Sequence, residues 1–200
     1  MSYPIAFEAD YVERRSRLSA FFRLILAIPL LIWAYFYGIV AGIAIVVAWV
    51  AIVITGRYPQ GLYAFVAGFT RFQARTLAFM ALLSDPYPPF VGSEDSSYPV
   101  RMSFAGPLER YSRLKTFFRF ILAIPILIMR YAMNILLEIG AVAAWFVIVI
   151  TGKMPRGLFD LMVLANSYTA RSDAYFYLLS ETYPPFQDEQ TRAAGTPQPL

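Results

Sequence analysis

The sequence predicts a mainly α-helical membrane protein of two tandem repeats, each with a short strand, an apolar helical hairpin and an amphipathic interfacial helix. Composition is the first reason, because 58% of the 200 residues are hydrophobic and 15% are charged, whereas a soluble domain has about 25% charged residues. Two apolar runs are the second reason. Residues 24–54 contain no charged side chain, and residues 120–150 contain only Arg130 and Glu138. Each run is long enough for helices that cross the hydrocarbon of a bilayer.

The alternative is that both runs are buried core helices of a soluble all-α protein. That fold needs polar segments to wrap both helices, and little of the chain is polar enough. The absence of cysteine and histidine excludes disulfide scaffolds, thiol nucleophiles, Ser-His-Asp triads and histidine-ligated metals. The N-terminal segment is acidic as well as basic and does not have the pattern of a signal peptide. We therefore expect the first apolar run to insert the chain and to stay in the mature protein.

The chain is one unit written twice. A shift of 96 residues aligns 13–90 with 109–186 without a gap, and about half of these positions are identical. Such self-similarity is typical of a duplicated structural unit. It predicts a first membrane repeat at 1–92, a linker at 93–97 and a second repeat at 98–186. Residues 187–200 are polar and contain proline and glycine, which favours a disordered tail.

Each repeat begins with apolar residues in alternation, at Ile5 and Phe7 and again at Val100, Met102 and Phe104. This period of two predicts a strand. Because two equivalent strands are present, we expect each strand to pair with its counterpart in the other repeat. A basic helix start then leads directly into the apolar run of each repeat.

The apolar run is predicted to turn back on itself near Tyr37-Gly38, or near Asn134 in the second repeat, and so to form a hairpin of two helices. The returning helix should end at Gly56 in the first repeat, since glycine is common just past a helix end. Pro59 should open the next helix, since proline is favoured in the first turn. Thr151-Gly152 and Pro155 repeat these signals in the second copy.

The third helix of each repeat, about 59–83 and 155–179, is mixed in character. Apolar residues dominate, but Arg71 and Arg75 are four apart and share one face. This pattern is typical of a helix that lies in the interface plane of a membrane. The alternative is a third span, which would place two arginines near its centre at a cost of a few kcal/mol each.

The basic residues flank the apolar runs, and only Arg130 falls near a predicted hairpin tip. By the positive-inside rule, both termini and both interfacial helices should face the cytoplasm of a multi-pass inner-membrane protein, with the repeats parallel and related by a two-fold axis along the membrane normal. The hairpins are short for full crossing, so a re-entrant hairpin remains the alternative. Both arrangements place the charged ends on one side.

Two groups of residues are candidate sites. The first is a set of arginines that recur in both repeats and would contact lipid headgroups or an acidic partner, here called the basic collar: Arg17, Arg23, Arg75, Arg113, Arg119 and Arg171. The second is an ion pair between Arg130 and Glu138 that would cap the hairpin tip of the second repeat. We find no catalytic constellation, glycine-rich phosphate loop or metal ligand set, and expect no cofactor. The arginines flank apolar runs and so suit headgroups better than nucleic acid.

Three motifs occur twice: FFR-x-ILAIP at the start of the apolar run, I-T-G-[RK]-x-P-x-G-L at its exit, and a closing YPPF. With them, nearly the whole chain apart from the tail resembles a bacterial membrane-protein family known only as a domain of unknown function. The resemblance implies a bacterial inner-membrane protein and brings no catalytic residues.

The sequence favours a non-catalytic accessory or scaffold subunit that docks a larger membrane-protein complex through its cytoplasmic basic collar. The alternative is a protein that binds or transports a lipid or small amphiphile, with a site between the two repeats. A scaffold should co-purify with its complex, whereas a lipid-handling protein should occur alone or as a homo-oligomer with lipid between its repeats.

Overall fold

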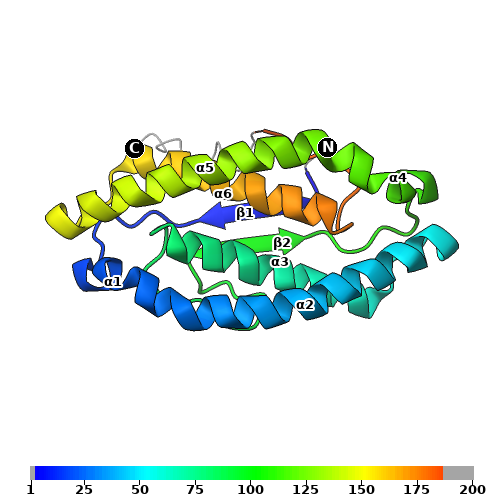
Figure 1. Cartoon of the computed structure of the whole chain (residues 1–200), viewed down its shortest axis with the longest axis horizontal. Helices are drawn as coiled ribbons and strands as arrows, with labels where there is room; N and C mark the ends of the chain where they lie inside the picture. The colour runs from blue at the N-terminus through cyan, green and yellow to red at the C-terminus, as the bar shows by residue number, and fades with distance from the viewer. Residues whose placement is uncertain (1–2, 187–200) are drawn as a thin grey trace.

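The computed structural model describes residues 3–186, and the predicted disordered tail at 187–200 lies outside the described residues. The two repeats have the same order of elements: a strand, a short helix, a long helix and a helix of intermediate length (Figure 1). In the first repeat these are β1 (Ile5–Ala9), α1 (Arg17–Phe21), α2 (Arg23–Thr55) and α3 (Gln60–Met80). In the second they are β2 (Val100–Phe104), α4 (Arg113–Phe117), α5 (Arg119–Thr151) and α6 (Arg156–Phe176).

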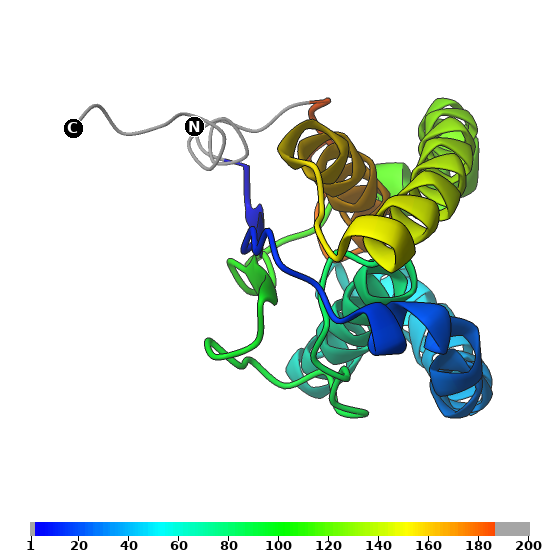
Figure 2. The same ribbon diagram turned by 90° about the vertical axis from the view of Figure 1, so that its left-hand side faces the viewer.

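The elements form three layers, which Figure 2 shows in a view along the long axis of the molecule. The long helices α2 and α5 form one outer layer and run in opposite directions (Figure 1). Helices α3 and α6 form the middle layer, where they pack against each other. Strands β1 and β2 form the other outer layer, near the middle of the long axis (Figure 1).

The prediction that the two strands pair with each other is confirmed. They form an antiparallel two-stranded sheet in which Phe7 faces Met102. Ile5 faces Phe104 and Ala9 faces Val100, so the register is symmetric about the central pair. A two-fold axis near this pair, perpendicular to the sheet, therefore relates the two repeats.

The predicted helix ends are also confirmed. Helix α2 ends at Thr55, and Gly56 follows in the left-handed conformation with φ +74°, where its N–H donates to Ile52 O at 2.7 Å. Gly152 ends α5 in the same way, with φ +73°. Helix α3 begins directly after Pro59. Glycine at the left-handed position and proline before the next helix are local signals, which explains why the sequence locates these turns well.

The predicted helical hairpin is wrong, because each apolar run is one continuous helix of 33 residues. The expected turn at Tyr37-Gly38 lies in the middle of α2, and Asn134 lies in the middle of α5. Gly38 does not end the helix, because it lies against α3, where a Cβ would be 3.7 Å from the Phe69 ring. Pro29 lies inside α2 and does not end it, and α2 packs against α3.

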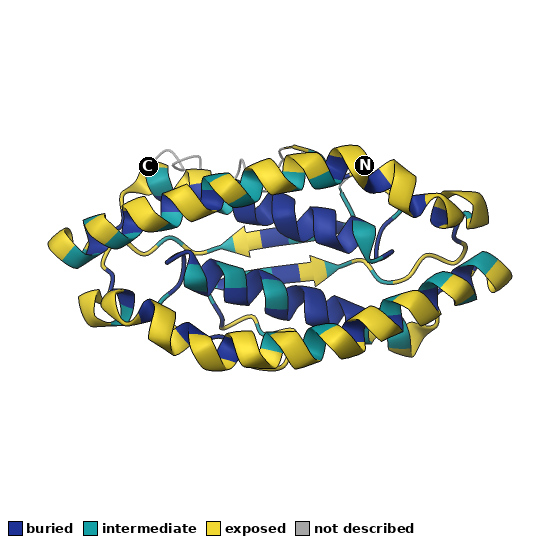
Figure 3. Ribbon diagram, viewed as in Figure 1, coloured by how far each residue is buried: buried dark blue, intermediate teal, exposed yellow. Residues whose placement is uncertain are grey.

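The interpretation of the third helices as interfacial is wrong as well. Helices α3 and α6 are the most buried elements, with 13 of 21 residues buried in α3. The long apolar helices are instead the exposed ones (Figure 3). In the most apolar window of each, only 22% of α2 and 28% of α5 residues are buried inside the molecule.

The repeats interlock at both ends of the long axis. At one end Arg15 N–H donates to Gly152 O, and Lys153 forms an ion pair with Glu13 at 2.8 Å. At the other end Tyr111 N–H donates to Gly56 O. Basic residues therefore lie at both ends of α2 and α5. The predicted gathering of all charged ends on one side depended on the hairpin and is wrong with it.

Candidate functional site between the two repeats

A cavity of about 230 Å³ lies between the four longer helices at the centre of the molecule. Its walls come from α2 and α5 on one side and from α3 and α6 on the other. Helices α3 and α6 pack against each other behind it, whereas α2 and α5 diverge (Figure 2). The α3–α6 contact thus lies on the side of the cavity toward the sheet, and α2 and α5 lie on the side away from it. Its lining consists of Ala34, Thr70, Gln73, Ala74, Thr76, Leu77, Met80, Arg130, Asn134, Asn166, Thr169, Ala170 and Asp173.

Equivalent positions of the two repeats face each other across this cavity. With the shift of 96 residues, Thr70 corresponds to Asn166, and Ala74 corresponds to Ala170. The cavity thus lies close to the two-fold axis that relates the repeats. A site on this axis is built only when both repeats fold together, because neither repeat supplies all of its walls.

Several buried polar atoms line the cavity without a hydrogen-bond partner in the described part of the chain: Thr76 Oγ1, Asn166 Oδ1 and Thr169 Oγ1. The Asn166 amide has one partner, since its Nδ2 donates to Ala74 O at 3.3 Å. Buried polar groups in proteins are nearly always satisfied, by protein, water or ligand. These atoms therefore require a hydrogen-bonding occupant, which is water when nothing else is bound.

An ion pair forms the charged part of the wall. Arg130 Nε on α5 lies 2.6 Å from Asp173 Oδ1 on α6. Burial raises the pKa of the Asp173 carboxyl, and the Arg130 guanidinium opposes that shift. Beside it, Tyr177 Oη donates to Gln73 Oε1 at 3.3 Å. The cavity thus offers a paired charge and several neutral hydrogen-bonding groups inside otherwise apolar walls.

The predicted pair between Arg130 and Glu138 is wrong. Both residues lie on the continuous helix α5, so they do not flank a turn. They are eight residues apart, about 12 Å along the axis. Glu138 is exposed, whereas Arg130 points to α6 and Asp173. The sequence pointed to the correct arginine but to the wrong partner.

The basic collar is mostly internal. Arg23, Arg75 and Arg119 are each 2% exposed and Arg171 is fully buried, so these four do not face headgroups or a partner. Only Arg17 and Arg113 are exposed.

The buried arginines have structural partners that lie far away in sequence. Arg75 Nε donates to Val100 O in β2 at 3.2 Å, and its Nη1 donates to Ser93 O at 3.0 Å. Arg23 pairs with Asp85 at 3.0 Å and donates to Ser84 O. These arginines join the helices to the sheet and to the segments that follow α3.

Helices α2 and α5 are exposed along most of their length (Figure 3), and apart from Glu138 on α5 their exposed residues are almost all apolar. Leu24, Ile43 and Ile54 on α2 are 77%, 63% and 66% exposed, and Ile150 on α5 is 72% exposed. Both helices are long and apolar enough to cross a membrane, by length and composition alone. A contiguous apolar surface of this size is unusual on a soluble monomer and marks an interaction site.

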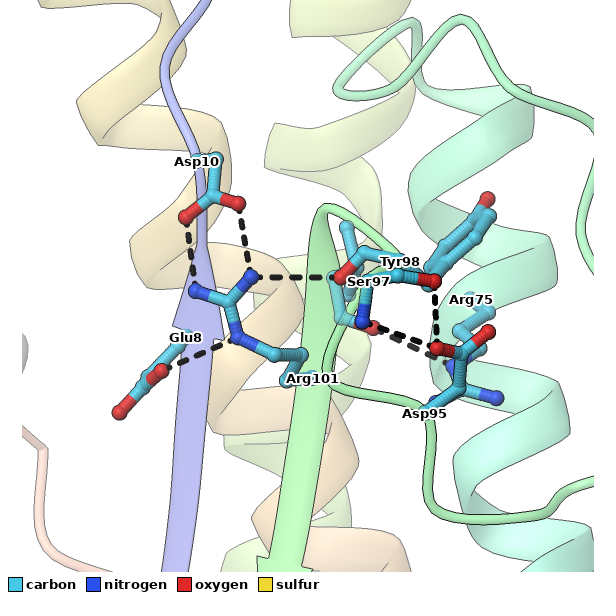
Figure 4. Close-up of polar contacts among 8 residues, drawn as sticks. Glu8, Asp10, Arg75, Asp95, Ser97, Tyr98 and Arg101 are labelled. Carbon is cyan, nitrogen blue, oxygen red and sulfur yellow. Dashed lines mark hydrogen bonds and ion pairs between the residues drawn. The ribbon is translucent and has the colours of Figure 1, made fainter.

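The opposite face of the molecule is polar. Figure 4 shows Arg101 on β2 with Glu8 and Asp10 of the first repeat. Its Nη1 and Nη2 each donate to one Asp10 carboxylate oxygen at 2.7 Å, and its Nε donates to Glu8 Oε2 at 3.2 Å. Asp95 accepts from the N–H and hydroxyl of Ser97. The molecule is thus amphipathic across its shortest dimension.

Reasoning from the sequence missed the cavity residues Thr76, Asn166 and Thr169. A signal was present, because the third helix of each repeat carries polar residues among its apolar ones. An interfacial helix gives such residues no inward role, whereas the structure turns them toward the cavity. No group of three or more carboxylates that could hold a metal ion occurs among residues 3–186.

Comparison with known proteins adds the family. A family model described as a domain of unknown function, DUF4389, matches the chain twice, at residues 17–92 and 113–187. No curated protein and no solved structure matches the chain. The two matches cover most of the chain, and each covers the three helices of one structural repeat, so the protein belongs to the DUF4389 family and carries its domain in duplicate.

Proposed function

We propose that the protein is a non-catalytic membrane protein that binds a lipid or small amphiphile in the cavity between its two repeats. One observation carries this proposal: a cavity with unpaired, buried polar atoms is lined by two helices whose exposed residues are mostly apolar. A polar head in the cavity would satisfy these atoms, and its chain could leave between α2 and α5 along apolar surface. At about 230 Å³ the cavity is below the usual 300–1,000 Å³ of ligand pockets, so it suits a headgroup rather than a whole lipid.

The distribution of polarity supports a membrane location. In a water-soluble protein the most apolar segments are the most buried ones. Here the reverse occurs, because α2 and α5 are the most exposed of the four longer helices, while α3 and α6 contain buried arginine, asparagine and threonine. Lipid is the partner that fits an apolar face along two helices of 33 residues, each about 50 Å long.

We further propose that α2 and α5 lie parallel to the membrane plane, with their outer faces in one leaflet. Helices placed upright would exceed the hydrocarbon thickness of about 30 Å. They would also bring the sheet, which lies behind their middle (Figure 1), to the depth of the bilayer centre. Open sheet edges do not occur in contact with hydrocarbon. The side chains of Glu8 and Arg101 on this sheet, and of Asp10 just after β1, are exposed to about a quarter or more.

The flat orientation gives each of the two faces of the molecule a fitting environment. The α2–α5 face contacts acyl chains, and the sheet with Arg101 faces water. Arg17 and Arg113, at opposite ends, are near the level of the headgroups, where arginines with apolar stems are favourable. In this orientation the two-fold axis between the repeats is parallel to the membrane normal. The predicted multi-pass topology with both termini in the cytoplasm gives way to a protein bound to one leaflet.

The scaffold hypothesis has less support. Burial removes four of the six residues of the basic collar from the surface, and the two remaining arginines lie at opposite ends of the molecule. A larger complex that covers the α2–α5 face is an outcome that the following experiment detects.

The test is purification in a mild detergent followed by mass spectrometry of the bound lipids and proteins. We expect an amphiphile in stoichiometric amount with the wild-type protein and its loss from the double variant T76V/T169V, which removes two unpaired cavity hydroxyls but keeps their shape. The matched control is T116V, because Thr116 Oγ1 is buried and unpaired but outside the cavity. An amount of amphiphile per protein in T76V/T169V that equals the wild-type amount contradicts the site. A stoichiometric protein complex without bound amphiphile favours the scaffold.

A further inference from the structure

A second cavity, also of about 230 Å³, lies between the C-terminal half of α2 and the start of α5. Its walls are apolar with one exception. Ile45, Val46 and Trp49 come from the first repeat, and Phe120, Phe176 and Leu178 come from the second. The single charged residue among these described lining residues is Arg119.

Arg119 is buried without a charged partner. It is 2% exposed, and both Nε and Nη2 lack a hydrogen-bond partner in the described part of the chain. Its guanidinium lies over the Tyr175 ring, with Cζ 4.0 Å from the ring centroid. A cation–π contact of this kind stabilises the charge by a few kcal/mol at most, which is less than the cost of removing an unpaired ion from water.

The first repeat shows how such an arginine is normally satisfied. Arg23 corresponds to Arg119 and lies over Phe79 in the same way, with Cζ 4.1 Å from the ring centroid. Arg23 Nη2 pairs with Asp85 Oδ1 at 3.0 Å, and its Nη1 donates to Ser84 O at 3.0 Å. Within residues 3–186, no carboxylate pairs with any donor of Arg119 as Asp85 pairs with Arg23.

The difference between the repeats lies in the carboxylates that follow α3 and α6. Asp85 accepts the Ser16 N–H with Oδ2 and uses Oδ1 for Arg23. Its counterpart Glu181 accepts the equivalent Ser112 N–H at 2.6 Å, but its other oxygen makes no ion pair with Arg119. The second repeat thus keeps the contact between the carboxylate and the backbone N–H, but its arginine has no carboxylate partner.

We propose that Arg119 binds the anionic head of a single-chain amphiphile, through two carboxylate or phosphate oxygens that replace the missing Asp85-type partner. A guanidinium donates two parallel hydrogen bonds to either group. The apolar walls accept the first part of the chain, and the rest follows the exposed face of α2. This site is distinct from the central cavity and stands whether or not that cavity binds an amphiphile.

The test uses the tryptophan that lines the cavity. The chain has three tryptophans, and Trp49 lines this cavity. Trp145 is its counterpart on α5, outside this cavity, where its ring stacks on Phe21 of the first repeat. A long-chain fatty acid brominated near its carboxylate should quench the fluorescence of W145F in detergent in a saturable manner. It should quench W49F far less. The alcohol of the same chain length should bind at least tenfold more weakly, and a brominated monoacyl phosphate tells which head is preferred.

Substitution of the arginine completes the test. R119Q should weaken binding of the brominated acid at least tenfold. R119K should weaken it less, because lysine keeps the charge but cannot donate two parallel hydrogen bonds as a guanidinium does. R23Q, which removes the paired arginine, should leave the affinity unchanged.

Circular dichroism checks that each variant is folded, and if R119Q does not fold, the comparison of W49F with W145F and of acid with alcohol still decides. Equal quenching by acid and alcohol, or equal quenching in W49F and W145F, overturns the proposal. Displacement by acetate or inorganic phosphate at the same concentration also overturns it.

Discussion

Arg130 and Asp173 form an ion pair between α5 and α6, and they replace Ala34 and Leu77 at the equivalent positions of the first repeat. All four residues line the central cavity. At these two positions the first repeat has a small and an apolar residue, and the second repeat has a basic and an acidic one. We call this paired difference between the repeats the matched exchange. Loss of either charge alone would leave the other half-buried and unpaired.

Replacement of Asp173 alone should destabilise the protein. D173L leaves the Arg130 guanidinium without its partner, and since the arginine side chain is 33% exposed, we expect a loss of about 2 kcal/mol rather than the roughly 3–5 kcal/mol of a fully buried pair. The double variant R130A/D173L recreates the first-repeat residues and should recover most of this loss. Denaturant unfolding in detergent of the two single variants and the double variant measures the coupling. Additive losses would show that the pair is not coupled.

A close backbone contact between Gly68 and Gly92 gives a second prediction. A Cβ on Gly92 would lie 1.6 Å from Gly68 O on α3, which is far inside any real contact. G92A should therefore separate the segment after α3 from the helix and should also disturb Arg71, whose Nη1 donates to Gly92 O. We expect a loss of several kcal/mol in unfolding free energy, or no folded protein.

The control for this substitution is G61A. Gly61 lies in the first turn of α3, and a Cβ there has nothing within 4 Å. Alanine is a better helix former than glycine, so G61A should be neutral or stabilise the protein by up to about 1 kcal/mol. If thermal unfolding shows the two variants to be equally stable, the close contact does not exist in solution.

Local signals decided which parts of the fold could be predicted. Gly56 and Pro59 act on their own backbone, so the turn between α2 and α3 follows from sequence alone. The alternation around Phe7 and Met102 identified both strands and their pairing. The self-comparison identified the duplication, which the two family matches confirm.

The remaining features depend on contacts between distant residues. An apolar run of 31 residues is compatible with a hairpin or a single helix, and packing of Gly38 against Phe69 on α3 decides for the helix. An arginine such as Arg75 is expected at the surface from its residue type alone. It is buried because the carbonyl of Val100, 25 residues later in the sequence, accepts a hydrogen bond from its Nε. The central cavity combines side chains from four helices. Its clearest sequence signal is the matched exchange of Ala34 and Leu77 for Arg130 and Asp173, which becomes visible only when the repeats are compared pairwise.

A cluster of buried tyrosines predicts alkaline unfolding. Tyr58 lies with its ring centroid 5.3 Å from that of Tyr63 and 5.9 Å from that of Tyr111. Burial raises the pKa of Tyr63 to about 12 and also raises the pKa of Tyr58 and of Tyr111, whereas an unfolded tyrosine has a pKa of about 10. An acid with a higher pKa in the folded state favours folding while it is protonated. The free energy of unfolding should thus be unaffected below pH 10 and should fall as pH rises through about 12.

Absorbance at 295 nm and far-UV circular dichroism, recorded on the same alkaline titration, check this expectation. Ionisation of the buried tyrosines should coincide with loss of helix, and Y63F should move the midpoint to higher pH. Y35F changes an exposed ring and should leave the midpoint in place. Full ionisation of all tyrosines near pH 10 with helix intact would contradict the burial of this cluster.

The orientation in the membrane is testable because the chain has no cysteine of its own. Ile28, Ile43 and Val50 on the exposed face of α2 can each be replaced by a single cysteine and spin-labelled. If α2 lies in the plane of the membrane, power-saturation measurements should place the three labels at the same shallow depth, about 5–10 Å into the acyl region. If α2 crosses the bilayer, Ile28 and Val50 are 22 residues and about 33 Å apart along the membrane normal, so the label at Ile43 should be far deeper than the outer two.

Ser103 on β2 is exposed on the sheet face, and a label there should be accessible to a water-soluble nickel chelate only if that face is outside the bilayer. Unequal depths along α2, together with a label at Ser103 that is shielded from the chelate, would exclude the flat orientation.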